Sequence, residues 1–160
     1  MSTQGDLSLL NDTVAQTLLK STNMAHLAYI WDDGTPRVIP IWFHWNGKEL
    51  VMGSPTKSPK IHILPNHSKV AVTIDSNAWP YKVLSIRGTA VVSIIDGMVP
   101  EYTLSAEHYF GAQAGKDWIN TVNTLFTQFA RIVVTPEWVG ILDFEQRFPG
   151  AIAAAMAGAG

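Results

Sequence analysis

Hydrophobic residues near the start of the chain recur with the period of a helix. They stand at spacings of three and four, at Leu7, Leu10, Val14 and Leu18. This spacing predicts an amphipathic helix over residues 6–20, and Asp6 is available as its N-cap. A second helical segment is predicted over residues 105–127, broken near Gly115 because glycine weakens a helix interior.

The apolar residues elsewhere follow the pattern of strands. Runs rich in β-branched and aromatic residues predict strands at 26–31, 37–45, 48–53, 69–75, 82–95, 131–134 and 139–144. The turn dipeptides Asp33-Gly34 and Asn46-Gly47 predict that the first three strands form a meander. Gly88 lies inside the longest run and predicts a bulge or a close backbone approach. About seven antiparallel strands with helices at the start and between later strands predict an α+β fold built on a small barrel.

The order of these elements predicts one domain over residues 1–160. The amino-terminal helix occupies residues 1–22, and the barrel with its inserted helices occupies residues 24–144. No internal repeat or linker divides the chain. The alanine-rich end, residues 150–160, is low in complexity and is predicted to be a flexible tail or one that lies on a partner.

Composition restricts the class of protein. The chain has no cysteine, which excludes disulfides and thiolate metal sites. A net charge of −2 with 15% charged residues gives no basic surface for nucleic acid or a membrane. The start lacks the pattern of a signal peptide, and no apolar stretch approaches the roughly 20 residues of a membrane span, so a cytoplasmic protein is expected. Six tryptophans and 47% apolar residues indicate an aromatic core or a surface buried between subunits.

A short polar turn between two apolar strands gathers hydroxyl and ammonium groups, namely Ser54, Thr56, Lys57, Ser58 and Lys60. Ser58 is a suitable N-cap and Pro59 a suitable first residue, so a helix is predicted to begin here and to end at about Leu64. Hydroxyls, backbone N–H groups and the positive end of a helix dipole together favour a bound phosphate. The alternative is that Ser58-Pro59 only begins a helix and that both lysines are solvated.

The strand over residues 37–45 is apolar on both faces, so both faces must be covered. One face is suited to a barrel interior. The other, with Val38, Pro40 and Trp42, is suited to a second subunit, a helix or a flat ring. Pro40 lacks a ladder donor, which predicts an edge strand or an interrupted pairing.

The connection before the longest strand carries Trp79, Tyr81 and Lys82. Aromatic side chains with polar tips beside a cation in a loop are typical of a ligand site. The alternative is a Trp-Pro turn that folds over one end of the barrel and has a structural role alone.

Known catalytic and metal-binding motifs are absent from the sequence. His62 and His67 are five residues apart and do not share a helix face, so no metal site is predicted. Nucleophile elbows, zinc-protease motifs and Walker-type loops are missing, and the carboxylates are scattered. A hydrolase built on protein side chains therefore has no support, and no catalytic residue is predicted.

Taken together, the ordered motifs resemble the pyridoxamine 5'-phosphate oxidase-like family of flavin and deazaflavin oxidoreductases. The resemblance spans roughly residues 24 to 144. It rests on the order Gly34-x-Pro36-Arg37-Val38-x-Pro40-x-Trp42-Phe43, then Ser54 to Lys60, Leu64-x-Asn66, Trp79-x-Tyr81 and Arg87-Gly88-Thr89-Ala90.

This resemblance implies an FMN-binding split β-barrel that forms a homodimer, with one flavin-type cofactor per subunit at the interface. In that arrangement Arg37, Val38, Ile39, Pro40 and Trp42 run beside the isoalloxazine ring and ribityl chain. The 5'-phosphate is held by Ser54, Thr56, Lys57, Ser58 and Lys60. The ring is approached from the next loop by Trp79, Tyr81 and Lys82.

The sequence also departs from the true oxidase, which has an arginine where this chain has Pro59 and a lysine where it has Trp42. Oxidation of pyridoxamine phosphate is therefore not expected. The hypothesis is an FMN-dependent oxidoreductase that transfers hydride to or from a small planar organic substrate. Two alternatives stay open: a reductase of the same fold that uses a 5-deazaflavin coenzyme, and a non-catalytic flavin-binding carrier or sensor.

Overall fold

The computed structural model describes residues 3–159, whose strands form one antiparallel sheet in the order β2-β1-β5-β6-β7-β4-β3. The strands are β1 (Ala25–Ile30), β2 (Pro36–Ile41), β3 (His44–Trp45), β4 (Leu50–Pro55), β5 (Lys69–Asp75), β6 (Lys82–Asp96) and β7 (Gln128–Asp143). The helices are η1 (Leu7–Asn11), α1 (Thr13–Leu19), α2 (Pro59–Ile63), α3 (Pro100–Phe110), α4 (Ala112–Leu125) and α5 (Gly150–Gly158). This α+β architecture confirms the predicted split barrel.

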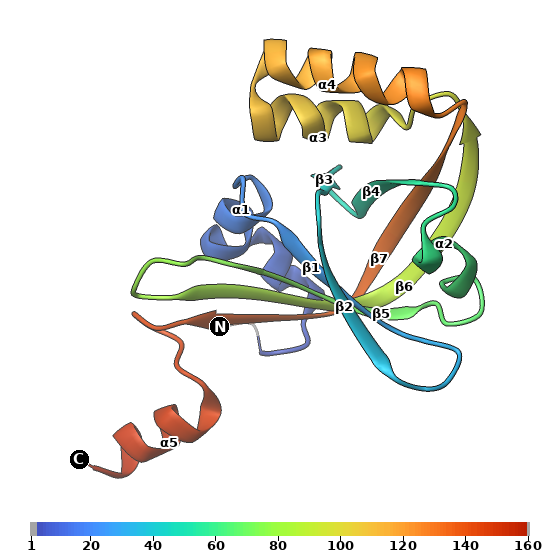
Figure 1. Cartoon of the computed structure of the whole chain (residues 1–160). Coiled ribbons are helices and arrows are strands. Elements are labelled where there is room, and N and C mark those ends of the chain that lie inside the picture. The colour runs from blue at the N-terminus through green and yellow to red at the C-terminus, as the bar shows by residue number, and fades with distance from the viewer. Residues whose placement is uncertain (1–2, 160) are drawn as a thin grey trace.

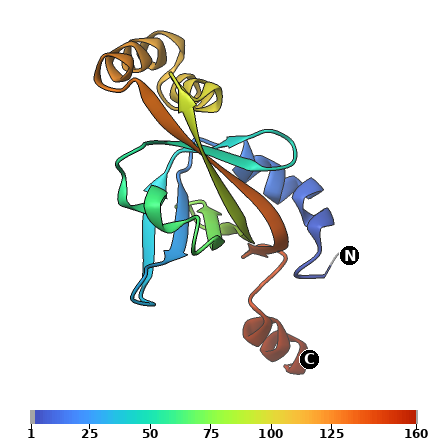
Figure 2. The same ribbon diagram turned by 90° about the vertical axis from the view of Figure 1, so that its right-hand side faces the viewer.

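The two edges of the sheet are consecutive in sequence. β2 is one edge, β3 is the other, and only Trp42 and Phe43 join them. A connection of this length spans about 10 Å, so the sheet must curl until its edges approach each other. Figures 1 and 2 show this curl, with β6 and β7 running across the whole molecule. The interior is filled by buried aliphatic residues such as Leu27, Met52 and Ile132.

The predicted meander over residues 26–53 is wrong. The expected strand 37–45 breaks at Trp42, β2 pairs only with β1, and the β3–β4 hairpin pairs with β7 at the other end of the sheet. The break allows the chain to pass from one edge of the barrel to the other. β2 is an edge strand, which confirms the edge prediction made from Pro40.

The two strands predicted around Thr135-Pro136 are one continuous strand, β7. Its pairing with β6 shifts between Arg87, which pairs with Trp138, and Gly88, which pairs with Pro136. Glu137 is therefore the extra residue of a bulge in β7, next to the proline. A Cβ placed on Gly88 would lie 2.1 Å from the carbonyl oxygen of Thr135. The predicted bulge and close approach at Gly88 are therefore confirmed.

The helical segments also differ from the predictions. The first helix is split into η1 and α1, because Asp12 accepts a hydrogen bond from the N–H of Val14 and caps a second start. The later segment begins at Pro100 and breaks at Gly111, whose φ is +87°, not at Gly115. Gly115 lies instead against α3, where an added Cβ would approach Glu107 to 2.6 Å.

Two outlying parts flank the barrel. The α3–α4 hairpin is carried on the far ends of β6 and β7, while α5 projects from the opposite end of β7 (Figure 1). The predicted helix start at Ser58-Pro59 is confirmed by α2. The structure folds residues 150–158 as a helix with exposed side chains, and their predicted flexibility stays a prediction. Within residues 3–159, no helix is both long and apolar enough to cross a bilayer.

Candidate functional site

A cavity of about 240 Å³ opens where the edge strand, the polar turn and the helical hairpin meet. β2 and the chain after it contribute one wall, the end of β4 and the first turn of α2 contribute the floor, and α3 with α4 contributes the opposite wall. The lining residues are Met24, Ile39, Pro40, Ile41, Trp42, Gly53, Ser54, Lys60, Tyr102 and Trp118. The fold thus brings together two segments that sequence reasoning associated with one ligand.

The polar part of this cavity comes from the turn between β4 and α2. The Ser54 side chain is buried, and its hydroxyl donates a hydrogen bond to the Ser58 hydroxyl at 3.0 Å. The N–H of Ser58 donates to the carbonyl of Pro55, which closes the turn and directs Lys60 toward the cavity. Thr56 and Lys57 lie in the same turn but do not line the cavity.

Lys60 is half-buried and lines the cavity with its ammonium group unpaired. Across residues 3–159 it makes no ion pair and no side-chain hydrogen bond. Burial lowers the pKa of Lys60 below that of an ordinary lysine. A desolvated cation beside a buried hydroxyl is the arrangement that a bound anion would stabilise.

Aromatic rings line the cavity where the chain after β2 meets the helical hairpin. The ring of Trp42 stacks on Tyr109, with centroids 5.4 Å apart, and meets the edges of Phe110 and Trp118. The indole N–H of Trp118 donates to the Tyr102 hydroxyl at 3.0 Å. Burial raises the pKa of Tyr109 to about 12, so this phenol stays neutral under the stacked indole.

The remaining predicted residues of β2 lie outside the cavity. Arg37 is exposed, and its guanidinium sits 5.1 Å from the centroid of Trp31. Val38 is 66% exposed on the edge strand. Ile39, Pro40 and Trp42 are the residues of this segment that the structure brings to Ser54 and Lys60.

Trp79, Tyr81 and Lys82 lie at a different end of the barrel. Trp79 and Tyr81 pack edge-to-face, and both contact Phe144. Lys82 forms an ion pair with Glu145 at 3.0 Å. A second cavity, of about 540 Å³, lies beside Tyr81 and Phe144 and shares no lining residue with the first.

The separation of these two groups is measured along β7. Ser54 pairs with Ala130, whereas Lys82 pairs with Asp143, thirteen residues further along the strand. At ~3.3 Å per residue this is about 40 Å of strand, shortened somewhat by curvature. The two groups of predicted residues therefore lie apart in one chain and do not form one cavity.

Met24, Tyr102 and Trp118 were not among the predicted site residues. They come from the start of β1 and from the helical hairpin, and only tertiary structure places them beside Lys60. Nothing in the local sequence pattern selected them. In residues 3–159 no three His, Asp or Glu side chains are grouped to hold a metal ion.

Comparison with known families decides which fold family this is. The model of the pyridoxamine 5'-phosphate oxidase family matches residues 12–143, most of the chain. The chain belongs to this family. A search of curated proteins finds no match.

Solved structures with the same fold include proteins of several kinds. An F420 reductase is 27% identical, with a TM-score of 0.61, and the match covers 78% of this chain and 94% of that one. The heme storage protein HutZ from Vibrio cholerae is 16% identical, with a TM-score of 0.60, over 82% and 93% of the two chains. An FAD-binding protein from Mesorhizobium loti is 16% identical, with a TM-score of 0.53, over 79% and 89%. Proteins of this fold thus include a reductase and a storage protein.

Proposed function

We propose that this protein is a flavin-dependent oxidoreductase that binds FMN at a homodimer interface and transfers hydride to or from a small planar organic substrate. The observation that carries the proposal is the unpaired, half-buried Lys60 beside the buried Ser54 hydroxyl. Both groups fit the phosphate of FMN: the ammonium supplies the counter-charge, and the hydroxyl supplies a hydrogen bond. In the free protein Ser54 donates its single hydroxyl proton to the Ser58 hydroxyl at 3.0 Å, so on FMN binding either Ser54 turns this proton to the phosphate or Ser58 donates its own.

The apolar wall next to this cation fits the rest of the cofactor. Ile39, Pro40 and Trp42 present flat, uncharged surface from an edge strand whose outer side is open. A tricyclic ring lying on this wall would bury apolar area, and backbone groups of the edge strand remain free for its polar rim.

The position of the second group of predicted residues, Trp79, Tyr81 and Lys82, supports a dimer. The cavity at Lys60 is smaller than the roughly 300–1,000 Å³ of ordinary ligand sites. Trp79, Tyr81 and Lys82 lie too far along β7 to complete it within one chain. In a twofold dimer the same surface of both chains meets at the interface, so these three residues of each chain can complete the cavity of the other chain.

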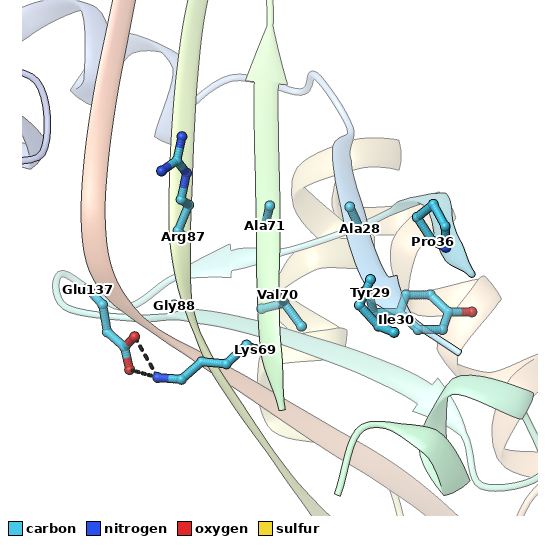
Figure 3. A pocket seen from close by; sticks show the side chains of 10 residues that line it. All are labelled: Ala28, Tyr29, Ile30, Pro36, Lys69, Val70, Ala71, Arg87, Gly88 and Glu137. Atoms are coloured by element: carbon cyan, nitrogen blue, oxygen red, sulfur yellow. Dashed lines mark hydrogen bonds and ion pairs between the residues drawn. The ribbon is translucent and has the colours of Figure 1, made fainter. Parts of the chain in front are cut away.

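The outer face of the sheet fits such an interface. Around a shallow cavity of about 320 Å³, Ala28, Pro36 and Ala71 present small apolar side chains, as Figure 3 shows. Val38 and Ile30, 66% and 39% exposed, extend this face along β2 and β1. The Lys69–Glu137 ion pair, with Nζ 2.7 Å from a carboxylate oxygen, marks its rim. An apolar centre with a polar rim is typical of subunit contacts.

Bound FMN would supply the redox chemistry, accepting and donating hydride at its ring. The residues of this chain have the remaining tasks. Lys60 and Ser54 fix one end of the cofactor, the edge strand orients the ring, and the aromatic hairpin excludes water from one side. No acid or base beyond Lys60 and Tyr102 lines the cavity, which agrees with chemistry that resides in the cofactor.

A second candidate is a 5-deazaflavin coenzyme in place of FMN. The 27% identity to an F420 reductase, over nearly all of that chain, favours it. Titration of the purified protein with FMN and with the deazaflavin coenzyme, followed by fluorescence, tests both. Tighter binding of FMN supports the proposal, tighter binding of the deazaflavin favours the second candidate, and binding of neither overturns both. Tight binding without reduction by NAD(P)H or by reduced deazaflavin would instead indicate a carrier or sensor.

A further inference from the structure

We propose that Trp118, with Phe110 and Met24 beside it, is the specificity-determining platform for the substrate, and that it selects an uncharged, apolar ring. The inference rests on the proposed function, because it assigns the substrate class of that same site. It concerns the wall of the cavity formed by α3 and α4, whose side chains have no part in the proposed phosphate contacts.

The platform is exposed but rigid. Phe110 is 50% exposed, Trp118 is 41% exposed and Met24 is 39% exposed, and the two rings lie 6.4 Å apart in an edge-to-face arrangement. The Trp118 indole is fixed by its hydrogen bond to Tyr102 and by its edge contact with Trp42. An aromatic face held in one orientation at a cavity mouth binds a flat ring with little loss of side-chain entropy.

The hairpin also has contacts with the barrel that do not involve these side chains. The hairpin is held to the barrel by the Glu101–Arg131 ion pair, by the Tyr109 hydroxyl, which donates to the Asn23 carbonyl, and by buried Val122. Trp118 belongs to α4 but lines the cavity together with Lys60, whereas Leu125 of the same helix is 65% exposed and lines no part of it. Trp118 is therefore assigned to the site, whereas Leu125 is an exposed residue of the same helix with no part in it.

The charge of the cavity decides the substrate class. Lys60 is the only charged side chain among the lining residues. Once Lys60 neutralises the cofactor phosphate, the lining offers no cation to an acidic or phosphorylated substrate. The Lys82 that a partner would add in the proposed dimer is already ion-paired with Glu145 at 3.0 Å. A neutral ring, such as that of a quinone or nitroaromatic compound, meets apolar and aromatic partners only, and an added anionic group would be desolvated without a partner.

Equilibrium dialysis with 1,4-naphthoquinone in the dark tests the platform on the full chain, with and without FMN. Loss of one aromatic contact in Trp118→Ala is expected to weaken naphthoquinone binding by about three- to tenfold. Trp118→Phe is expected to stay within about twofold of wild type, and the matched control Leu125→Ala is expected to be unchanged. Wild type should also bind 1,4-naphthoquinone-2-sulfonate more weakly than the neutral quinone.

The outcomes separate this inference from the proposed function. FMN affinity equal to wild type in Trp118→Ala, with weakened quinone binding, supports both. Equal loss of FMN and quinone would place Trp118 in the cofactor site and overturn the platform. Unchanged quinone binding in Trp118→Ala, no quinone binding by wild type, or preference for the sulfonate would each overturn it as well. If wild type binds no FMN, the proposed function fails, while the quinone measurements on the FMN-free protein still decide the platform.

Discussion

Replacement of Lys60 by methionine has two opposite effects that follow from one feature, the half-buried ammonium without a partner. Methionine keeps the length and apolar stem of the side chain and removes the charge. In the FMN-free protein, the cost of desolvating an unpaired cation disappears, so Lys60→Met is expected to unfold at a higher temperature than wild type. In the FMN complex the same change removes the counter-charge of the phosphate.

The size of the binding effect follows from the contact that is lost. A hydrogen bond to a charged group is worth about 1.5 to 3 kcal/mol. At 1.4 kcal/mol for each tenfold change, this predicts FMN binding roughly 10- to 150-fold weaker in Lys60→Met. Lys57→Met is the matched control, since Lys57 is exposed in the same turn and does not line the cavity. Its expected effect is below about threefold.

Fluorescence titration with FMN and with riboflavin separates a phosphate contact from a general defect. Riboflavin has the same ring and ribityl chain but no phosphate, so Lys60→Met and wild type should bind it equally. An equal loss for FMN and riboflavin would refute the assignment, because Lys60 would then act through the fold. A lower unfolding temperature of FMN-free Lys60→Met would refute the claim that its charge is unpaired.

Three other predictions concern the barrel and its hairpin. Gly88→Ala should lower the free energy of unfolding by about 2 to 3 kcal/mol, because its Cβ would meet the Thr135 carbonyl oxygen at 2.1 Å. Gly150→Ala, with no atom near its Cβ, should change this free energy little. Equal effects of the two substitutions in chemical denaturation would contradict the prediction. Glu101→Gln should cost about 1 to 2 kcal/mol at neutral pH, since Arg131 donates two hydrogen bonds to this carboxylate. Hydrogen bonding to Arg131 lowers the pKa of Glu101 below 4.5. The stabilisation that the Glu101 carboxylate contributes is therefore complete above that pH and is lost as pH falls through the lowered pKa. A difference in the free energy of unfolding between wild type and Glu101→Gln that does not narrow in acid would count against this.

The strand pattern of the barrel was predictable because it is local. β5 and β6 follow runs of β-branched residues, and Gly88 marked its bulge without any knowledge of its partner. The joining of two predicted strands into β7 was not predictable in this way. Pro136 is typical of a strand break, and only the pairing with β6 shows that β7 continues through a bulge at Glu137, next to the proline.

The candidate site was predictable only in part, for the same reason. Ser54 and Lys60 could be inferred together because one short turn contains both. Ile39 to Trp42 could be associated with them through family order, and the fold places these groups in one cavity. Trp118 could not be assigned, because its position depends on how the hairpin lies over the barrel, and nothing in local periodicity encodes that placement.

The distance in space between Lys60 and the pair Trp79 and Tyr81 could not be predicted from the local sequence either. Trp79 and Tyr81 follow Lys60 after a single strand, β5, and that strand takes the chain to the other end of the barrel. The sequence order of a site thus differs from its arrangement in space, and the partner subunit is the proposed means of reuniting its parts.

The flavin content of the purified protein, measured with the mass of the complex that carries it, tests the central proposal most directly. After incubation with FMN and removal of free cofactor, light scattering combined with flavin absorbance should give one FMN per chain in a particle twice the mass of the 17.5 kDa chain. A colourless protein that retains no flavin, or a monomer that retains FMN in full, would contradict the proposed interface site.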